Sequence, residues 1–199
     1  MKKTVTRQGT PARQAVILNA ALACFTRQGI EATTISDICD RAGCSIGSLY
    51  HHFGNKEGIA SQLFIRGIGQ LNEDLLNQLE TCSNAESGVR VVVTQYADWV
   101  TVHKPLARFL LQSRQIQFPN DVKSQVRDTH HAHIQKVFEW FAPFVADGAM
   151  KILPVESYIP IISGPIQEYT RRWLAGQIKQ PPAELKIVFA DAAWNSVRV

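Results

Sequence analysis

Hydrophobic residues recur at intervals of three and four along most of this chain, and no stretch keeps the strict alternation of a half-buried strand. The first such stretch predicts a helix from about Pro11 to Gln28, followed by Gly29 in the left-handed position past its end. Its apolar stripe consists of Ala15, Leu18, Leu22 and Phe25. The periodicity therefore predicts an all-α fold.

Two short helices are expected next, joined by a tight turn. Thr34 opens the first, with Asp37 three residues later as the acid of a capping box. Gly43 ends it, and Ser45 caps a helix from Ile46 to about His52. The spacing is that of a helix-turn-helix at about residues 34–52.

A longer helix is predicted from Lys56 to about Leu79. Further helices are expected near 86–103, 105–115, 120–144, 154–176 and 182–197. Pro160 and Pro165 fall inside the fourth of these, where each removes a backbone hydrogen bond. We expect a kink or an irregular first half in that helix.

The net charge of +4 is mild, but its distribution is uneven. The basic residues that precede the first acid, Glu31, are Lys2, Lys3, Arg7, Arg13 and Arg27. This arm is read either as a contact for a polyanion or as a solvated tail.

The chain has no apolar run of 18 residues and no secretory signal, so neither a membrane span nor export is expected. Its four cysteines, Cys24, Cys39, Cys44 and Cys82, form no CxxC pair. We interpret them as free thiols in a reducing cytoplasm, with a redox switch through Cys44 as the alternative. No catalytic or dinucleotide fingerprint occurs, so neither an enzyme nor a cofactor is predicted.

The second short helix carries small and polar residues on its exposed side, which lets a helix enter the major groove of DNA. These residues are Ser45, Gly47, Ser48 and His51, while Leu49 and Phe53 point inward. Thr34, Tyr50 and Lys56 stand where they can reach phosphate. An ordinary pair of surface helices is the alternative.

Residues Ile17 to Phe64 resemble the DNA-binding domain of the tetracycline-repressor (TetR/AcrR) family. The matching positions are Ala20 to Phe25, Gly29, Thr33 to Ile35, Ile38, Ala42-Gly43, Ser48 to Tyr50, His52-Phe53 and Lys56-Glu57. The resemblance implies a DNA-binding domain over 1–55 and a helical ligand-binding and dimerisation domain over 56–199.

The resemblance also implies individual DNA contacts. Thr34 and Lys56 match phosphate contacts, Ser45, Gly47 and Ser48 match positions at base edges, and Tyr50 and His51 match a pair on the backbone or a thymine methyl. Ile46 stands where many members have lysine or arginine; it either loses a contact or touches a thymine methyl. His52 is expected to pack in the turn.

The last helix has two apolar faces, which predicts burial against both its own core and a partner. One face holds Leu185, Val188, Phe189, Ala192 and Ala193, and the other Ile187, Ala190, Trp194 and Val197. The helix before it offers Ile159, Ile162, Ile166, Tyr169 and Trp173. A homodimer through the last two helices is predicted; a last helix sunk in a monomer core is the alternative.

The helix near 120–144 places His130 and His133 on its apolar side. They are read as core histidines, as hydrogen-bonding groups of a ligand pocket, or as metal ligands with His103 or Asp128. The aromatic residues and histidine expected to line the same pocket are Tyr96, Trp99, His103, Phe109 and Trp140. A plain aromatic core is the alternative.

Together these features predict a dimeric repressor that a mostly apolar small molecule releases from a palindromic operator. An activator, a ligand-independent DNA-binding protein and a protein-interaction scaffold are the alternatives.

Overall fold

The computed structural model describes residues 10–113 and 120–199, and within those ranges the chain forms nine α-helices and no strand. The helices are α1 (Thr10–Gln28), α2 (Ile35–Ala42), α3 (Ile46–Phe53), α4 (Lys56–Leu79), α5 (Ala85–Val102), α6 (Lys104–Gln112), α7 (Asn120–Ala146), α8 (Val155–Leu174) and α9 (Pro182–Val197). The all-α prediction is confirmed, and the expected bounds hold to within three residues at each helix end.

The short helices begin and end at the residues that the sequence indicated. Thr34 accepts a hydrogen bond from the Asp37 backbone N–H, and the Asp37 carboxylate accepts one from the Thr34 N–H, which completes a capping box. Gly43 has φ +58°, and Ser45 accepts from the Ser48 N–H at 3.2 Å. Local capping chemistry therefore accounts for the helix-turn-helix.

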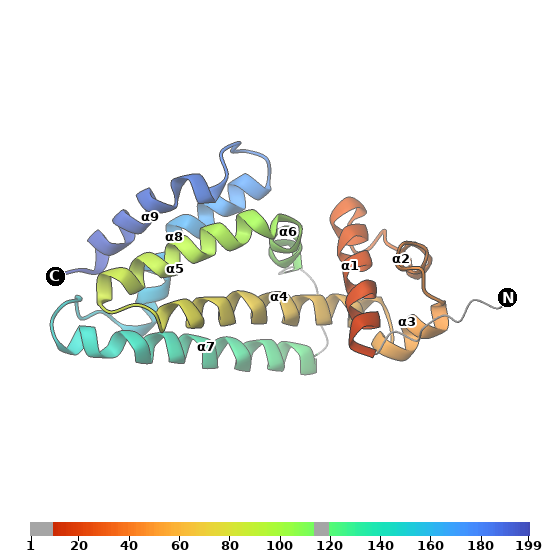
Figure 1. Ribbon diagram of the computed structural model, residues 1–199, viewed down its shortest axis with the longest axis horizontal. Helices are drawn as coiled ribbons and strands as arrows, with labels where there is room; N and C mark the ends of the chain where they lie inside the picture. The colour runs from red at the N-terminus through yellow and green to blue at the C-terminus, as the bar shows by residue number, and fades with distance from the viewer. Residues whose placement is uncertain (1–9, 114–119) are drawn as a thin grey trace.

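The molecule is elongated, with α1, α2 and α3 clustered at one end (Figure 1). From this cluster α4 runs along the length of the molecule beside α5 and α7, and α8 and α9 cover the other side of α5 (Figure 1). A single continuous helix, α4, thus connects the N-terminal cluster to the larger helical layer.

A buried apolar cluster joins the two parts. Phe25 of α1 and Phe109 of α6 stack with ring centroids 5.9 Å apart, and both are almost fully buried. Ile59 and Leu63, in the first turns of α4, belong to the same cluster. The packing between α1, α4 and α6 ties the position of the helix-turn-helix to that of α6.

Prolines do not interrupt the helices that contain them. Helix α8 is continuous through Pro160 and Pro165, so the irregular first half is not found, whereas the kink stays a prediction. Helix α7 likewise runs through Pro143. Apolar packing of Tyr158, Ile162 and Ile166 holds α8 in the core despite the missing hydrogen bonds.

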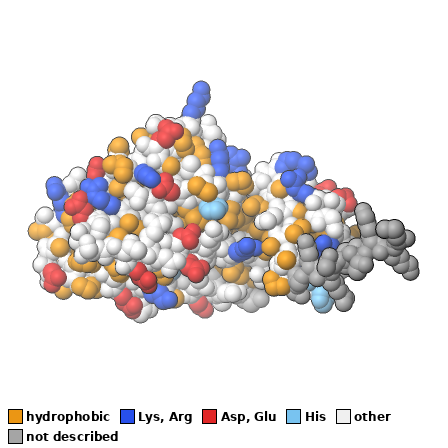
Figure 2. Space-filling view, viewed as in Figure 1, with side chains coloured by type: hydrophobic (Ala, Val, Ile, Leu, Met, Phe, Trp, Pro, Cys, Tyr) orange, Lys and Arg blue, Asp and Glu red, His pale blue; other side chains and the backbone are white. Residues whose placement is uncertain are grey.

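None of the helices in the described ranges has the length and apolar content needed to cross a bilayer. On the face shown in Figure 2, acidic and basic side chains are interspersed along the molecule. Charge on that face therefore does not mark a binding surface, so a candidate site has to be located from its geometry.

Candidate functional site

The surface formed by α2 and α3 carries the residues expected to contact DNA. Thr34, Ser45, Ile46, Gly47, Tyr50 and His51 are exposed, and Ser48 is half-buried. Tyr50 is 49% and Ile46 52% exposed although both are large and apolar. Leu49 is fully buried beneath them and fixes α3 to the core, so the outward side of α3 is rigidly presented.

His52 packs as expected within the chain. Its ring lies 5.2 Å from that of His51 and 6.1 Å from that of Phe53, and its side chain is half-buried. His51 packs edge to face on His52, but its side chain is exposed. Of the two histidines, His51 is the one available to a partner.

Lys56 has a role that the sequence did not reveal. Its ammonium donates to the carbonyl oxygens of Glu31 at 2.9 Å and Thr33 at 3.0 Å, across the loop that precedes α2. An ammonium has three donors, so one is left over. Lys56 therefore holds the loop that carries Thr34 while keeping one N–H for another group.

A second cation supports the turn. Arg13 of α1 donates to the carbonyl oxygen of Gly43 at 3.0 Å. Of the expected basic arm, Lys2, Lys3 and Arg7 lie outside the described residues, and Arg27 is exposed. Arg13 is thus a brace for the helix-turn-helix.

The capping acid is held ionised. The backbone and side chain of Thr34, and the amide of Gln28 at 3.1 Å, donate to Asp37 and keep its pKa below the ordinary value. Protonation of this carboxylate would remove an acceptor at the start of α2.

Two thiols lie at the same turn. Burial raises the pKa of the Cys39 thiol to about 11, and Cys44 contacts it from the residue after Gly43. All four cysteines are free thiols. The redox switch through Cys44 stays a hypothesis.

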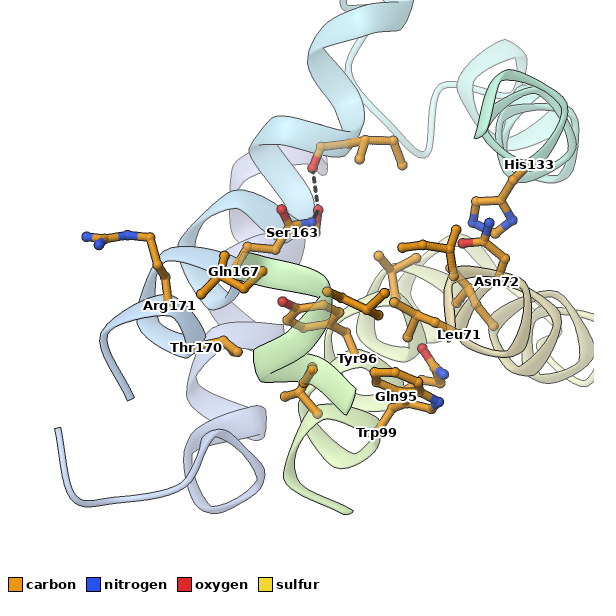
Figure 3. Close-up of a pocket in the computed structure, with 18 of the residues that line it drawn as sticks. Leu71, Asn72, Gln95, Tyr96, Trp99, His133, Ser163, Gln167, Thr170 and Arg171 are labelled. Atoms are coloured by element: carbon orange, nitrogen blue, oxygen red, sulfur yellow. Dashed lines mark hydrogen bonds between the residues drawn. The ribbon is translucent and has the colours of Figure 1, made fainter. Parts of the chain in front are cut away.

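A cavity of about 560 Å³ lies between α4, α5, α6, α7 and α8 (Figure 3). Its walls are mainly apolar, with Phe64, Ile68 and Leu71 from α4 and Leu110 and Leu111 from α6. A volume of this size is typical of a small-molecule site.

Polar side chains interrupt these apolar walls. They are Asn72, Gln95, His133, Ser163, Gln167 and Thr170, and Figure 3 shows them coming from different helices around the cavity. The Gln167 amide donates to the Ser163 hydroxyl at 2.9 Å. Trp99 and Thr170 are 5% and 2% exposed.

The rim carries one ion pair. The Arg171 guanidinium donates two hydrogen bonds to the Glu168 carboxylate, at 2.7 and 2.8 Å. The pairing lowers the pKa of Glu168 and raises that of Arg171. Arg171 points away from the centre of the cavity (Figure 3), so the pair adds little net charge there.

Three of the residues expected at a ligand site line this cavity: Tyr96, Trp99 and His133. The structure places the others elsewhere. Phe109 stacks on Phe25, and Trp140 packs so closely on α5 that a Cβ at Gly88 would collide with its ring. The side chain of His130 lies outside the described residues.

His103 lines a separate groove of about 300 Å³ between α1, α4 and α6, and its ring lies 4.9 Å from Trp99. The metal site considered for it includes His130, whose side chain lies outside the described residues, so that site stays a hypothesis; the described residues themselves hold no cluster of three His, Cys, Asp or Glu. Asn72, Gln95 and Thr170 were missed by sequence reasoning. The sequence pattern that could have identified them is a polar residue within an otherwise apolar stripe of a helix.

The outer side of α9 is apolar. Ile187 and Val188 are 57% and 63% exposed, whereas Ala190, Ala193 and Val197 are buried against α5 and α8. Two apolar faces are therefore present, but two residues were assigned to the wrong one: Ala193 belongs to the buried face and Ile187 to the exposed face.

In α8 the division differs from expectation. Ile162, Ile166 and Trp173 are buried in their own core, and Ile159 lines the cavity. Tyr169 alone among the expected residues stands at the outer side, 5.3 Å from Phe189 of α9.

Comparisons with known proteins agree with this arrangement. Residues 17–63 match the family model described as bacterial regulatory proteins, tetR family. The repressor KstR2 of Rhodococcus jostii is 27% identical over 131 residues, which cover 60% of this chain and 62% of the relative. KstR2 of Mycobacterium tuberculosis is 46% identical over 56 residues, 28% of each chain. The matches thus span between 28% and 62% of the length of these curated relatives.

The fold is shared over nearly the whole chain. The transcriptional regulator FadR from Bacillus subtilis, solved in complex with stearoyl-CoA, superposes with a TM-score of 0.77 at 20% identity. The superposition covers 90% of this chain and 96% of FadR.

Proposed function

We propose that this chain, whose N-terminal domain belongs to the tetR family of bacterial regulatory proteins, is a transcriptional repressor that a small molecule releases from its operator. The observation that carries the proposal is the exposed, rigidly supported surface of α3 at the start of α4, with a cavity against the same helix between Phe64 and Leu75. Domain boundaries at 1–55 and 56–199 are part of the proposal.

The DNA contacts are proposed to come from Thr34, Ser45, Ile46, Gly47, Ser48, Tyr50, His51 and Lys56. Six of them are exposed, and Ser48 and Lys56 are half-buried, which supports this assignment. Tyr50 and Ile46 offer apolar area to thymine methyl groups, and the third N–H of Lys56 reaches phosphate. Arg13 then positions the turn without touching DNA.

The repressor is proposed to act as a homodimer through α8 and α9. Exposed Ile187 and Val188, together with half-buried Tyr169 and Phe189, would be covered by the same surface of a second copy. A two-fold dimer carries two α3 helices and reads a palindromic operator.

The effector is proposed to bind in the α4–α8 cavity. The mainly apolar lining supports a largely apolar molecule, and the stearoyl-CoA bound to FadR supports one with a long acyl chain. Coupling would pass through Gly67 of α4, where a Cβ would lie only 3.1–3.2 Å from Leu106 and Leu110 of α6. Because the leucine side chains of α6 pack directly on the backbone of α4 at Gly67, a ligand that moves one helix would move the other.

The proposal is tested with DNA flanking the gene for this chain, by fluorescence anisotropy at two salt concentrations. We expect tight, salt-dependent binding that Tyr50→Ala weakens by roughly tenfold and Gln78→Ala, at the far end of α4, leaves unchanged. Equal loss in both variants, or no specific binding at any salt, would contradict the assignment of the reading surface.

A further inference from the structure

The groove that His103 lines lies where the N-terminal helices meet the larger helical layer. This α1–α6 groove, of about 300 Å³, is bounded by α1, α4, the end of α5 and the start of α6, and Figure 1 shows α6 between α5 and α1. Leu18, Leu22, Leu63 and Leu106 form its apolar part. Its volume is at the lower limit for small-molecule sites, so it suits a smaller ligand than the α4–α8 cavity does.

The charge of the α1–α6 groove has one sign. Arg66 lines it from α4, and no aspartate or glutamate is among its lining residues. The Arg66 side chain is exposed and makes no hydrogen bond or ion pair with any residue of the ranges 10–113 and 120–199. A guanidinium is always charged in proteins and binds a carboxylate through two parallel hydrogen bonds. The groove therefore offers an unpaired cation beside its leucines.

The apolar part of the groove is open to solvent. Val102, the last residue of α5, is 74% exposed at its edge, and Leu22 and Leu106 are half-buried. An aliphatic chain lying over these side chains would remove apolar surface from water, which favours binding. Because the cation and the apolar surface occur together, the groove suits a molecule that has both an anionic head group and an aliphatic chain.

We propose that the α1–α6 groove is a second ligand site, which binds an amphipathic carboxylate such as a medium-chain fatty acid anion. Arg66 binds the carboxylate, and the aliphatic chain packs on Leu22 and Leu106. This site is separate from the α4–α8 cavity and adds a ligand of its own to the proposed function.

The groove and the α4–α8 cavity share one contact between helices. Leu106 lines the groove and Leu110 lines the cavity, and a Cβ at Gly67 would lie 3.1 Å from the first and 3.2 Å from the second. A carboxylate in the groove would therefore act on the same α4–α6 packing as the proposed effector. This consequence for DNA binding rests on the proposed function, whereas binding in the groove does not.

The test measures binding of octanoate and octan-1-ol to the full chain by isothermal titration calorimetry. The two probes have chains of equal length and differ in the charge of the head group. We expect saturable binding of octanoate and weaker binding of octan-1-ol at low ionic strength, where the ion pair with Arg66 is little screened. Equal affinities for the two probes, or no binding of octanoate, would overturn the inference.

Variants locate the carboxylate. Arg66→Gln is expected to lower the octanoate affinity by about fivefold, the upper range for an exposed ion pair, and to leave octan-1-ol unaffected. Val102→Glu adds a like charge at the exposed edge of the groove and is expected to lower the octanoate affinity as well. Arg172→Gln is the matched control, because Arg172 is exposed and lines neither the groove nor the cavity. All three variants change exposed side chains, so we expect them to fold.

Arg171→Gln separates the two sites, because Arg171 is the cation at the rim of the α4–α8 cavity. An octanoate affinity that falls in this variant and not in Arg66→Gln would place the anion in that cavity and overturn the inference. Equal losses in Arg66→Gln and Arg172→Gln would overturn it too. Operator binding is a separate measurement: octanoate binding that depends on Arg66, in a chain that binds no operator DNA, would support the inference and contradict the proposed function.

Discussion

Replacing Lys56 with methionine separates its two assigned roles. The change keeps the aliphatic stem and removes the ammonium that donates to Glu31 and Thr33. A hydrogen bond to a charged group contributes about 1.5–3 kcal/mol, and the half-buried position lets water replace part of it. We expect a loss of about 2 kcal/mol from the free energy of unfolding, which lowers the melting temperature by about 4–8 °C for a chain of this size.

The proposed phosphate contact of Lys56 predicts a second measurable change, in the salt dependence of DNA binding. Each lost phosphate contact reduces the slope of log affinity against log salt by roughly 0.9, so a dimer losing two contacts loses roughly 1.8. The slope is measured by anisotropy between low and physiological salt, and stability by thermal denaturation. Lys151→Met is the matched control, because Lys151 also donates to a backbone carbonyl, that of Ser196, but at the opposite end of the molecule.

The two measurements test the two roles of Lys56 separately. An unchanged melting temperature would refute the reasoning that Lys56 stabilises the loop before α2. Lowered stability with an unchanged salt slope would support the hydrogen bonds to that loop and refute the phosphate contact.

Three further predictions follow from single contacts. Gly88→Ala should lower stability by about 1–3 kcal/mol because the added methyl meets the Trp140 ring, and chemical denaturation would detect it; no loss would mean that α7 does not rest on α5 there. The pKa of Asp37 is lowered in the folded chain, so its stabilising effect is complete above pH 3.8 and is lost as pH falls through the lowered value. Asp37→Asn should flatten that acid limb of the stability profile, and an unaltered limb would exclude the capping box as its source. Val188→Glu should yield monomers in sedimentation, and persistent dimers would place the interface elsewhere.

The helix-turn-helix could be read from the sequence because its signals are local. The capping hydrogen bonds of Thr34, Gly43 and Ser45 join residues only three or four positions apart, so the spacing alone was enough to locate the helix caps. The hydrogen bond from Lys56 to Thr33, 23 residues earlier, could not be predicted in the same way, because it depends on the orientation of α4 relative to α3.

The cavity was harder to predict because it depends on which side chains of five helices converge. Aromatic residues at helical spacing suit a core and a pocket equally well, and Phe109 and Trp140 proved to be core. Thr170 and Asn72 were the informative residues, since a polar group at an apolar stripe position needs a reason to be there.

The uninterrupted course of α4 has a mechanical consequence. Its 24 residues span about 36 Å, so the helix can act as a lever, with most of the cavity lining beyond Gly67 on one arm and Lys56 at the end of the other. Close packing at Gly67 provides the fulcrum. Lys56 lies about 16 Å along the helix from this fulcrum, so a rotation of about 10° would displace it by roughly 3 Å, which is close to the rise of one base pair. In the proposed dimer, a movement too small to alter the fold would therefore be enough to put both α3 helices out of register with successive turns of DNA.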